Sequence, residues 1–169
     1  DGKLMPVLDD VAIQTAGTIT GTPLLIFTVH SDNGEAETFV ETATKLWRMD
    51  STTAIDISRT AYGSGAVTQW DWAAYGTSLF FCAPNVTEFP HATPFLSDTT
   101  VTLLLNTPTN MTGHSIAMFK NQLFVLYTTE GATPFPRRLR RSVKGDMDDW
   151  DGPGSGFKDL EAFGQEGVS

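Results

Sequence analysis

Cysteine is almost missing from this sequence, since Cys82 is the single one among 169 residues. An internal disulfide is therefore excluded, and the apolar neighbours of Cys82 predict a buried strand thiol rather than a reactive one. Long apolar runs are missing too. The longest cover 23–29 and 101–105, well short of the ~18 residues of a membrane-spanning helix. We therefore expect no membrane anchor, and the absence of a secretory signal together with one cysteine favours a reducing cytoplasm.

Basic residues are also scarce. The 11 Lys and Arg residues stand against 20 Asp and Glu, which gives a net charge of −9. This balance disfavours wrapping on nucleic acid, because clustered cations supply most of the affinity for phosphate backbones. Helix signals are few as well, and only residues 156–163 predict a helical turn or two.

One pattern occurs three times: a strand-forming residue or two, a turn, and a run of large apolar residues. The copies cover 19–26, 74–81 and 118–125, so that their starts are 55 and 44 residues apart. Each predicts a β-hairpin, because apolar and aromatic residues flank a Gly, Asn or Pro suited to a tight turn. The spacing is close to the roughly 40 to 50 residues per blade of β-propellers.

The fold class we predict is all-β and antiparallel, with propeller-like blades. We expect one domain over 1–169, with repeats near 19–58, 70–106 and 114–145 and a loop-rich tail at 146–169. Three blades are fewer than the four or more of a closed propeller, so we expect a piece of a larger one. The further strands that we expect lie at 7–13, 24–29, 38–41, 44–49, 54–58, 68–75, 100–106, 115–119, 122–128 and 137–143, with a long loop at 84–98.

Aromatic side chains predict where the sheets pack. Trp70 and Trp72 lie two residues apart on one strand and therefore share a face, which requires a large partner surface. Together with Trp47 and Tyr75 they are the candidate structural core. The alternative for the tryptophans is an interface, since aromatic residues and Arg concentrate binding energy there.

No catalytic or cofactor motif is visible. His30, His91 and His114 share no metal-ligand spacing, and the glycine-rich stretches 63–65 and 152–156 open no helix that could bind phosphate. We therefore expect no enzyme activity and no cofactor. The acidic run 146–151 is the one candidate for calcium, but Trp150 occupies a ligand position. The other interpretation is a turn whose Asp side chains cap backbone amides while Trp150 packs inward.

A basic run stands out in this acidic chain. Alternation along a strand predicts that Arg138 and Arg140 point to one face, and Arg137, Leu139 and Arg141 to the other. Three interpretations of this basic run remain open: a strip of ion pairs toward an acidic partner, a nucleic acid binding site, and an edge strand kept soluble by its charge. With Trp150, these four arginines are the candidate interface residues.

Three segments near the end of the chain are Arg-Leu-Arg-Arg-Ser at 138–142, Gly-Asp-Met-Asp-Asp-Trp at 145–150 and Gly-Phe-Lys-Asp-Leu at 156–160. Earlier segments are Leu-Trp-Arg-Met-Asp at 46–50, Asp-Ile-Ser-Arg at 56–59 and the Trp-rich 70–76. In this order they resemble tailed-bacteriophage tail proteins of the β-propeller nozzle or tail-stabilisation kind. The likeness covers about 19–163, although the family often has an aromatic before Ser142 and Pro where Met147 stands.

The resemblance implies a structural role in the virion tail, assembled in the host cytoplasm. It implies a ring of copies, six in number, attached below the portal and adaptor, with other tail proteins as partners. Viral DNA would pass through without specific binding, and an acidic surface is compatible with a sliding polyanion. The alternative is a propeller-type module that binds a host glycan or protein through the loop 89–95.

Overall fold

The computed structural model describes residues 19–30, 36–50, 53–58, 67–76, 78–87, 89–92, 101–104 and 106–161. These form twelve strands in three four-stranded sheets. The expected strand at 7–13 lies outside the described residues. None of the described residues is helical, and accordingly none belongs to a helix with the length and apolarity needed to cross a membrane.

The strands of each sheet follow one another in chain order, and every neighbouring pair is antiparallel. The first sheet contains β1 (Pro23–His30), β2 (Ala36–Thr42), β3 (Leu46–Asp50) and β4 (Thr53–Asp56). The second contains β5 (Asp71–Tyr75), β6 (Ser78–Cys82), β7 (Pro90–Ala92) and β8 (Thr102–Leu103). The third contains β9 (Ser115–Phe119), β10 (Gln122–Glu130), β11 (Thr133–Arg141) and β12 (Gly156–Asp159). The all-β, antiparallel prediction is confirmed.

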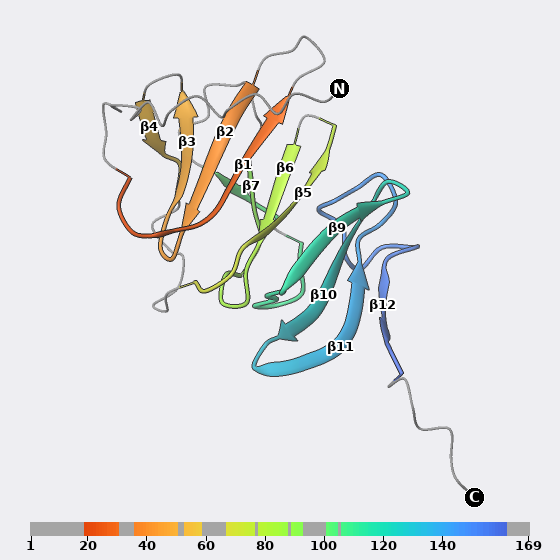
Figure 1. The fold of residues 1–169 in the computed structure, drawn as a ribbon. Helices are drawn as coiled ribbons and strands as arrows, with labels where there is room; N and C mark the ends of the chain where they lie inside the picture. Colours follow the sequence, from red (N-terminus) through yellow and green to blue (C-terminus); the bar gives the residue numbers. More distant parts are fainter. Residues whose placement is uncertain are drawn as a thin grey trace, which may run out of the picture.

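The three sheets form a stack with the second sheet in the middle (Figure 1). Phe81 and Leu79 of the second sheet, with Trp70 just before β5, pack against Phe39 and Leu46 of the first. The opposite face of the second sheet packs on the third, and this cluster contains Phe80, Cys82, Ile116, Leu123 and Val125. Alternation along β6 produces this two-sided burial, because successive side chains point to opposite faces.

Two of the three predicted hairpins are confirmed. β5 and β6 are joined by a two-residue turn at Gly76, whose φ of 56° suits glycine. β9 and β10 are joined by Lys120 and Asn121, with φ of 49° and 60°. Positive φ at both central residues is the mark of the type I′ turn, whose twist matches that of the flanking strands.

The hairpin predicted at 19–26 is wrong. Residues 19–22 are not a strand, and β1 begins at Pro23 and pairs with β2. Pro23 has no backbone N–H, and the first position of a strand tolerates that loss. The strand predicted at 24–29 exists, although its continuous apolar run, which is typical of a buried strand, is only partly buried, because Leu24 and Ile26 are 40% and 59% exposed. β1 lies at an edge of the first sheet and buries only alternate residues.

Two further corrections concern the second and third sheets. The loop predicted at 84–98 contains β7, which pairs with β6 through Leu79 and Phe80. The helical turn predicted from residue 156 is wrong, because Gly156–Asp159 is the strand β12 on the edge of β11. The backbone groups along β11 supply partners for these residues, and that pairing prevails over a weakly capped helix.

Candidate interaction surface

The arginine-rich segment lies on β11 and divides between two faces, as alternation predicted. Arg138 and Arg140 are each 8% exposed, whereas Arg137 and Arg141 are exposed. Arg140 pairs in register with Val125 of β10 and with Phe157 of β12, so these three share a face. Val125 belongs to the core between the second and third sheets. The two buried arginines therefore lie on the inner side of the third sheet.

Arg138 is held by aromatic rings and carboxylates together. Its guanidinium lies 3.6 Å from the ring centre of Phe135 and 3.8 Å from that of Phe157. It donates two hydrogen bonds to Asp159, of 2.8 and 2.9 Å, and is 3.5 Å from a Glu130 oxygen. The bond from Arg138 lowers the pKa of Asp159, and the same bond raises the pKa of Arg138. This bidentate, stacked geometry requires the planar fork of arginine.

Arg140 continues the same network. It donates to Glu130 at 3.1 Å and to Asp151 at 3.4 Å. Glu130 therefore lies between two arginines and connects the end of β10 to β11. These contacts join β10, β11, β12 and the loop before β12, so the inner half of the arginine segment stabilises this chain itself.

Trp150 belongs to the core of the chain and not to an exposed surface. Its side chain has no exposed area and its ring centre lies 6.0 Å from that of Phe89. Phe89, the first residue of the expected recognition loop, is also fully buried, and residues 93–95 lie outside the described residues. Trp150 is buried because the loop between β11 and β12 folds back under the third sheet, where its indole fills the second core cluster.

The acidic run 146–151 forms a turn in which Asp side chains cap backbone amides. This was one of the two interpretations of the run, the other being a calcium site. Asp146 accepts a hydrogen bond from the Asp148 amide, and Asp149 accepts from the amides of Asp151 and Gly152. Such bonds are the usual reason for Asp in turns. In the part of the chain that the structure describes, no group of three or more His, Cys, Asp or Glu residues could hold a metal ion.

The outer side of the third sheet carries apolar and basic side chains together. Along each strand, the outward residues alternate with residues that point into the core. Across the strands, the outward residues pair in register: Phe124 pairs with Ala117 and Arg141, and Leu139 pairs with Leu126 and Lys158. We call this surface the basic face and define it by the outward residues Ser115, Ala117, Phe119, Phe124, Leu126, Arg137, Leu139, Arg141 and Lys158. Apolar side chains form its centre, and Phe119 and Leu126 are 59% and 38% exposed.

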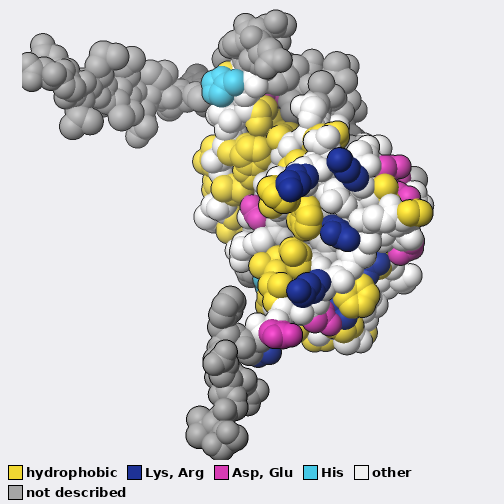
Figure 2. Space-filling view, turned by 90° about the vertical axis from the view of Figure 1, so that its right-hand side faces the viewer, with side chains coloured by type: hydrophobic (Ala, Val, Ile, Leu, Met, Phe, Trp, Pro, Cys, Tyr) yellow, Lys and Arg dark blue, Asp and Glu magenta, His cyan; other side chains and the backbone are white. Residues whose placement is uncertain are grey.

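The basic face carries positive charge without negative charge. None of its nine residues is acidic. Within the described part of the chain, Arg137, Arg141 and Lys158 form no ion pair. Figure 2, which looks at the side formed by the third sheet, shows Lys and Arg side chains interspersed with hydrophobic ones, and acidic side chains toward the margins.

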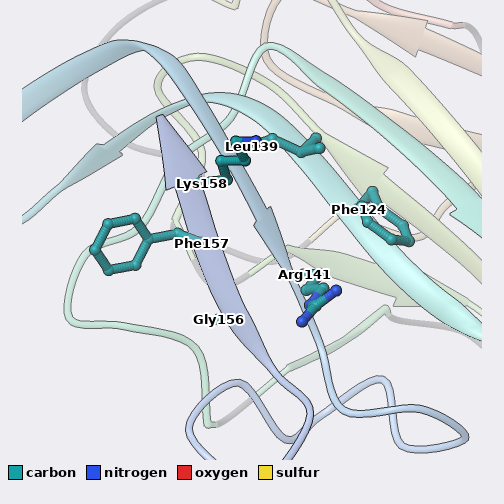
Figure 3. Close-up of a pocket in the computed structure, with 6 residues that line it drawn as sticks. All are labelled: Phe124, Leu139, Arg141, Gly156, Phe157 and Lys158. Atoms are coloured by element: carbon teal, nitrogen blue, oxygen red, sulfur yellow. The ribbon is translucent and has the colours of Figure 1, made fainter. Parts of the chain in front are cut away.

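A shallow hollow of about 380 Å³ opens on this side of the sheet. Phe124, Leu139 and Arg141 line it from β10 and β11, and Gly156 and Lys158 from β12, whereas the ring of Phe157 points away from these side chains (Figure 3). An apolar floor with cations at its edge suits a partner that has an apolar projection and carboxylates around it.

Of the four residues expected as structural core, Trp47 and Trp70 are buried, and Trp72 and Tyr75 are half-buried. Trp70 is buried in the first core cluster and donates its indole N–H to the Thr42 carbonyl at 2.9 Å. Trp72 packs against the same cluster, so the two share a face. Tyr75 packs against the second cluster. Trp47 is 7% exposed and lies with Val40 and Ala54 in a third, smaller cluster on the other side of the first sheet.

One buried acidic group was missed by the sequence reasoning. Glu41 has no exposed area, and neither carboxylate oxygen has a hydrogen-bond partner among the described residues. Burial, with the nearby Asp71 charge, raises the pKa of Glu41 to about 9. The same two carboxylates add to burial in raising the pKa of the Cys82 thiol, which is fully buried as predicted. The sequence held one indication that Glu41 is buried: it lies two residues after Phe39 on a strand, and therefore on the same face as that apolar side chain.

Comparisons with known protein families and with curated proteins find no match for this chain.

Proposed function

We propose that this chain is a structural protein of the bacteriophage virion tail, built as part of a β-propeller and assembled with further copies into a ring. The observation that carries the proposal is the repeated architecture. Three consecutive four-stranded antiparallel sheets, each with strands in chain order, stack face to face. Propeller blades have this construction.

The arrangement of neighbouring sheets supports the same proposal. β5 and β9, the first strands of the second and third sheets, pack closely against each other. The first strand of each propeller blade lies nearest the axis, so adjacent first strands are expected to approach one another. Asp71 of β5 accepts a hydrogen bond from the Ile116 amide of β9 at 2.9 Å, which fixes this approach.

The tail role itself comes from the resemblance of segments such as 138–142 and 145–150 to nozzle and tail-stabilisation proteins. In this role the working surfaces are contacts with further copies, with the adaptor or portal and with other tail proteins. No cofactor and no catalysis is part of the proposal. The net charge of −9 supports passage of DNA without specific binding, because a negative wall repels the phosphate backbone.

Negative-stain electron microscopy of the purified chain, together with its mass in solution, tests the proposal. We expect rings of identical subunits around a central channel. A chain that stays monomeric at every concentration would contradict self-assembly. Retention of such a monomer on immobilised host glycans would then favour the binding module over the tail structure.

A further inference from the structure

A second hollow, of about 320 Å³, lies between the second sheet and the loop that joins β11 to β12. Phe80, Leu103, Leu104 and Met147 give it an apolar lining, and Asp146 and Asp148 are its charged residues. We call it the acidic hollow. Asp146 is exposed, whereas the backbone around it is fixed by the turn of residues 143–146.

The basic face and the acidic hollow have complementary character. The cations of the basic face correspond to the carboxylates of the acidic hollow, where Asp146 is exposed and Asp148 accepts two hydrogen bonds from Asn106. The apolar lining of the hollow is largely buried, since Phe80, Leu104 and Met147 belong to the second core cluster. The two surfaces also lie on different parts of the chain, since the basic face is the outer side of the third sheet and the acidic hollow is lined from both the second sheet and the loop before β12. Both can therefore be used at the same time.

The charge distribution favours a head-to-tail contact over a symmetric one. Pairing two basic faces would bring Arg137, Arg141 and Lys158 of one copy against the same cations of another, and like charges in contact cost affinity. With these three cations set aside, the chain has 8 basic and 20 acidic residues. The rest of the surface of a second copy is thus strongly acidic. Within that surface, the acidic hollow combines carboxylates with an apolar lining.

Nucleic acid fits the basic face less well. Its centre is occupied by Phe124, Leu126 and Leu139, and few cations surround them. Phosphate backbones are bound by many clustered cations, and the overall charge of −9 opposes the approach of a polyanion.

We infer that the basic face of one copy binds the acidic hollow of the next copy, with Arg141 and Lys158 facing Asp146 and Asp148. The inference deepens the self-assembly in the proposed function and rests on it. Contacts between two different surfaces propagate, so that copies close into a ring or continue as a filament.

Sedimentation of the full chain and charge-reversed variants over a range of concentrations tests this contact. We expect Arg141→Glu to weaken self-association at least about tenfold, because it places like charges at a contact. Lys45→Glu is the matched control, since it makes the same charge change at the β2–β3 turn of the first sheet, away from both the basic face and the acidic hollow. It should leave the association constant near that of the unchanged chain.

A change in the acidic hollow tests whether it is the surface that the basic face binds. Asp146→Asn keeps an acceptor for the Asp148 amide and removes the charge, so it should also weaken association while the thermal midpoint stays near that of the unchanged chain. Arg141→Glu combined with Asp146→Lys should restore association, because the ion pair is then reversed. The double variant has the same net charge as the unchanged chain, so the control with the same charge change at a remote site, and not this restoration, excludes a general effect of net charge.

Other outcomes overturn the inference and can be told apart. Assembly that is equally strong in Arg141→Glu would overturn this contact and leave the proposed function standing. Stronger assembly in Arg141→Glu would indicate a symmetric contact between two basic faces. Binding of a fluorescent single-stranded DNA oligonucleotide that Arg141→Glu abolishes would assign the face to nucleic acid instead. An unchanged chain that never associates would remove both proposals.

Discussion

The indole ring of Trp72 lies stacked on the ring of Phe27, with their centres 4.2 Å apart and their planes 10° from parallel. Phe27 belongs to β1 and Trp72 to β5, so this pair joins the first sheet to the second. Phe27 also stacks on Phe39 at 5.4 Å and lies 6.2 Å from Phe81. Four aromatic rings from two sheets thus form one contact.

Replacing Phe27 by Ala should lower the free energy of unfolding by about 2 kcal/mol, because it removes a half-buried ring that packs against three others. Urea unfolding followed by tryptophan fluorescence measures the loss. Ile26→Ala is the matched control, since Ile26 is the neighbouring residue on β1 and is 59% exposed. Equal losses in the two variants would contradict the role of the aromatic contact.

Replacing Glu41 by Gln should change how stability depends on pH. The pKa of Glu41 is raised to about 9 in the folded chain, against an ordinary 4.5. Between these values the folded chain holds a proton that the unfolded chain releases, so stability is highest below pH 4.5 and falls as the pH rises toward 9. A glutamine side chain does not titrate, so that decline should be reduced in the variant.

Urea unfolding of the two chains at about pH 5 and about pH 8.5 measures this difference. The variant should gain stability relative to the unchanged chain as the pH rises. A difference between the two chains that does not vary with pH would mean that Glu41 is ionised in the folded chain or titrates normally. Comparing the two chains cancels the other titrating groups, because both chains share them.

Replacing Arg138 by Lys should lower the free energy of unfolding by about 1 to 2 kcal/mol. Lysine retains the charge but neither lies flat between Phe135 and Phe157 nor donates two parallel bonds to Asp159. Thermal unfolding measures the effect. Arg137→Lys is the control on the same strand, where the side chain is exposed, and it should change stability by less than about 0.5 kcal/mol. A similar effect at both sites would contradict the importance of the stacked geometry.

Replacing Lys120 by Gly should raise the free energy of unfolding by about 0.5 kcal/mol. Lys120 has a φ of 49°, in the left-handed region of the backbone. An ordinary residue loses about 1 to 2 kcal/mol in that region, and this loss exceeds the entropic cost of introducing glycine. Thermal unfolding of the variant beside the unchanged chain measures the gain. Lys144→Gly is the comparison, because Lys144 lies in a turn without a positive φ. That change should leave stability equal or lower, and a gain there would weaken the argument from backbone conformation.

The sequence was most informative where a local signal decides the structure. The turn residues Gly76 and Asn121 determine two hairpins, and the flanking strands were predicted with nearly the observed bounds. The division of Arg138 and Arg140 from Arg137 and Arg141 followed from strand alternation alone. In these cases the deciding interactions lie within a few residues along the chain.

The sequence was least informative where distant segments decide. β12 forms because β11 offers an edge to residues 156–159 across a loop that encloses Trp150, and no local pattern indicates that pairing. Trp150 and Phe89 were assigned to surfaces from residue type, but a packed loop buries both. The buried state of Glu41 likewise depends on the second sheet, which covers the inner face of β2.

The chain-order arrangement of strands within each sheet has a consequence for folding. Each strand pairs with the next strand along the chain, so every sheet can form by closing loops between consecutive strands, of which 142–155 between β11 and β12 is a long one. Contacts between sheets then join neighbours along the chain rather than its two ends. Folding can start in one sheet and spread to the next, so a nascent chain can form one sheet before the following one is synthesised.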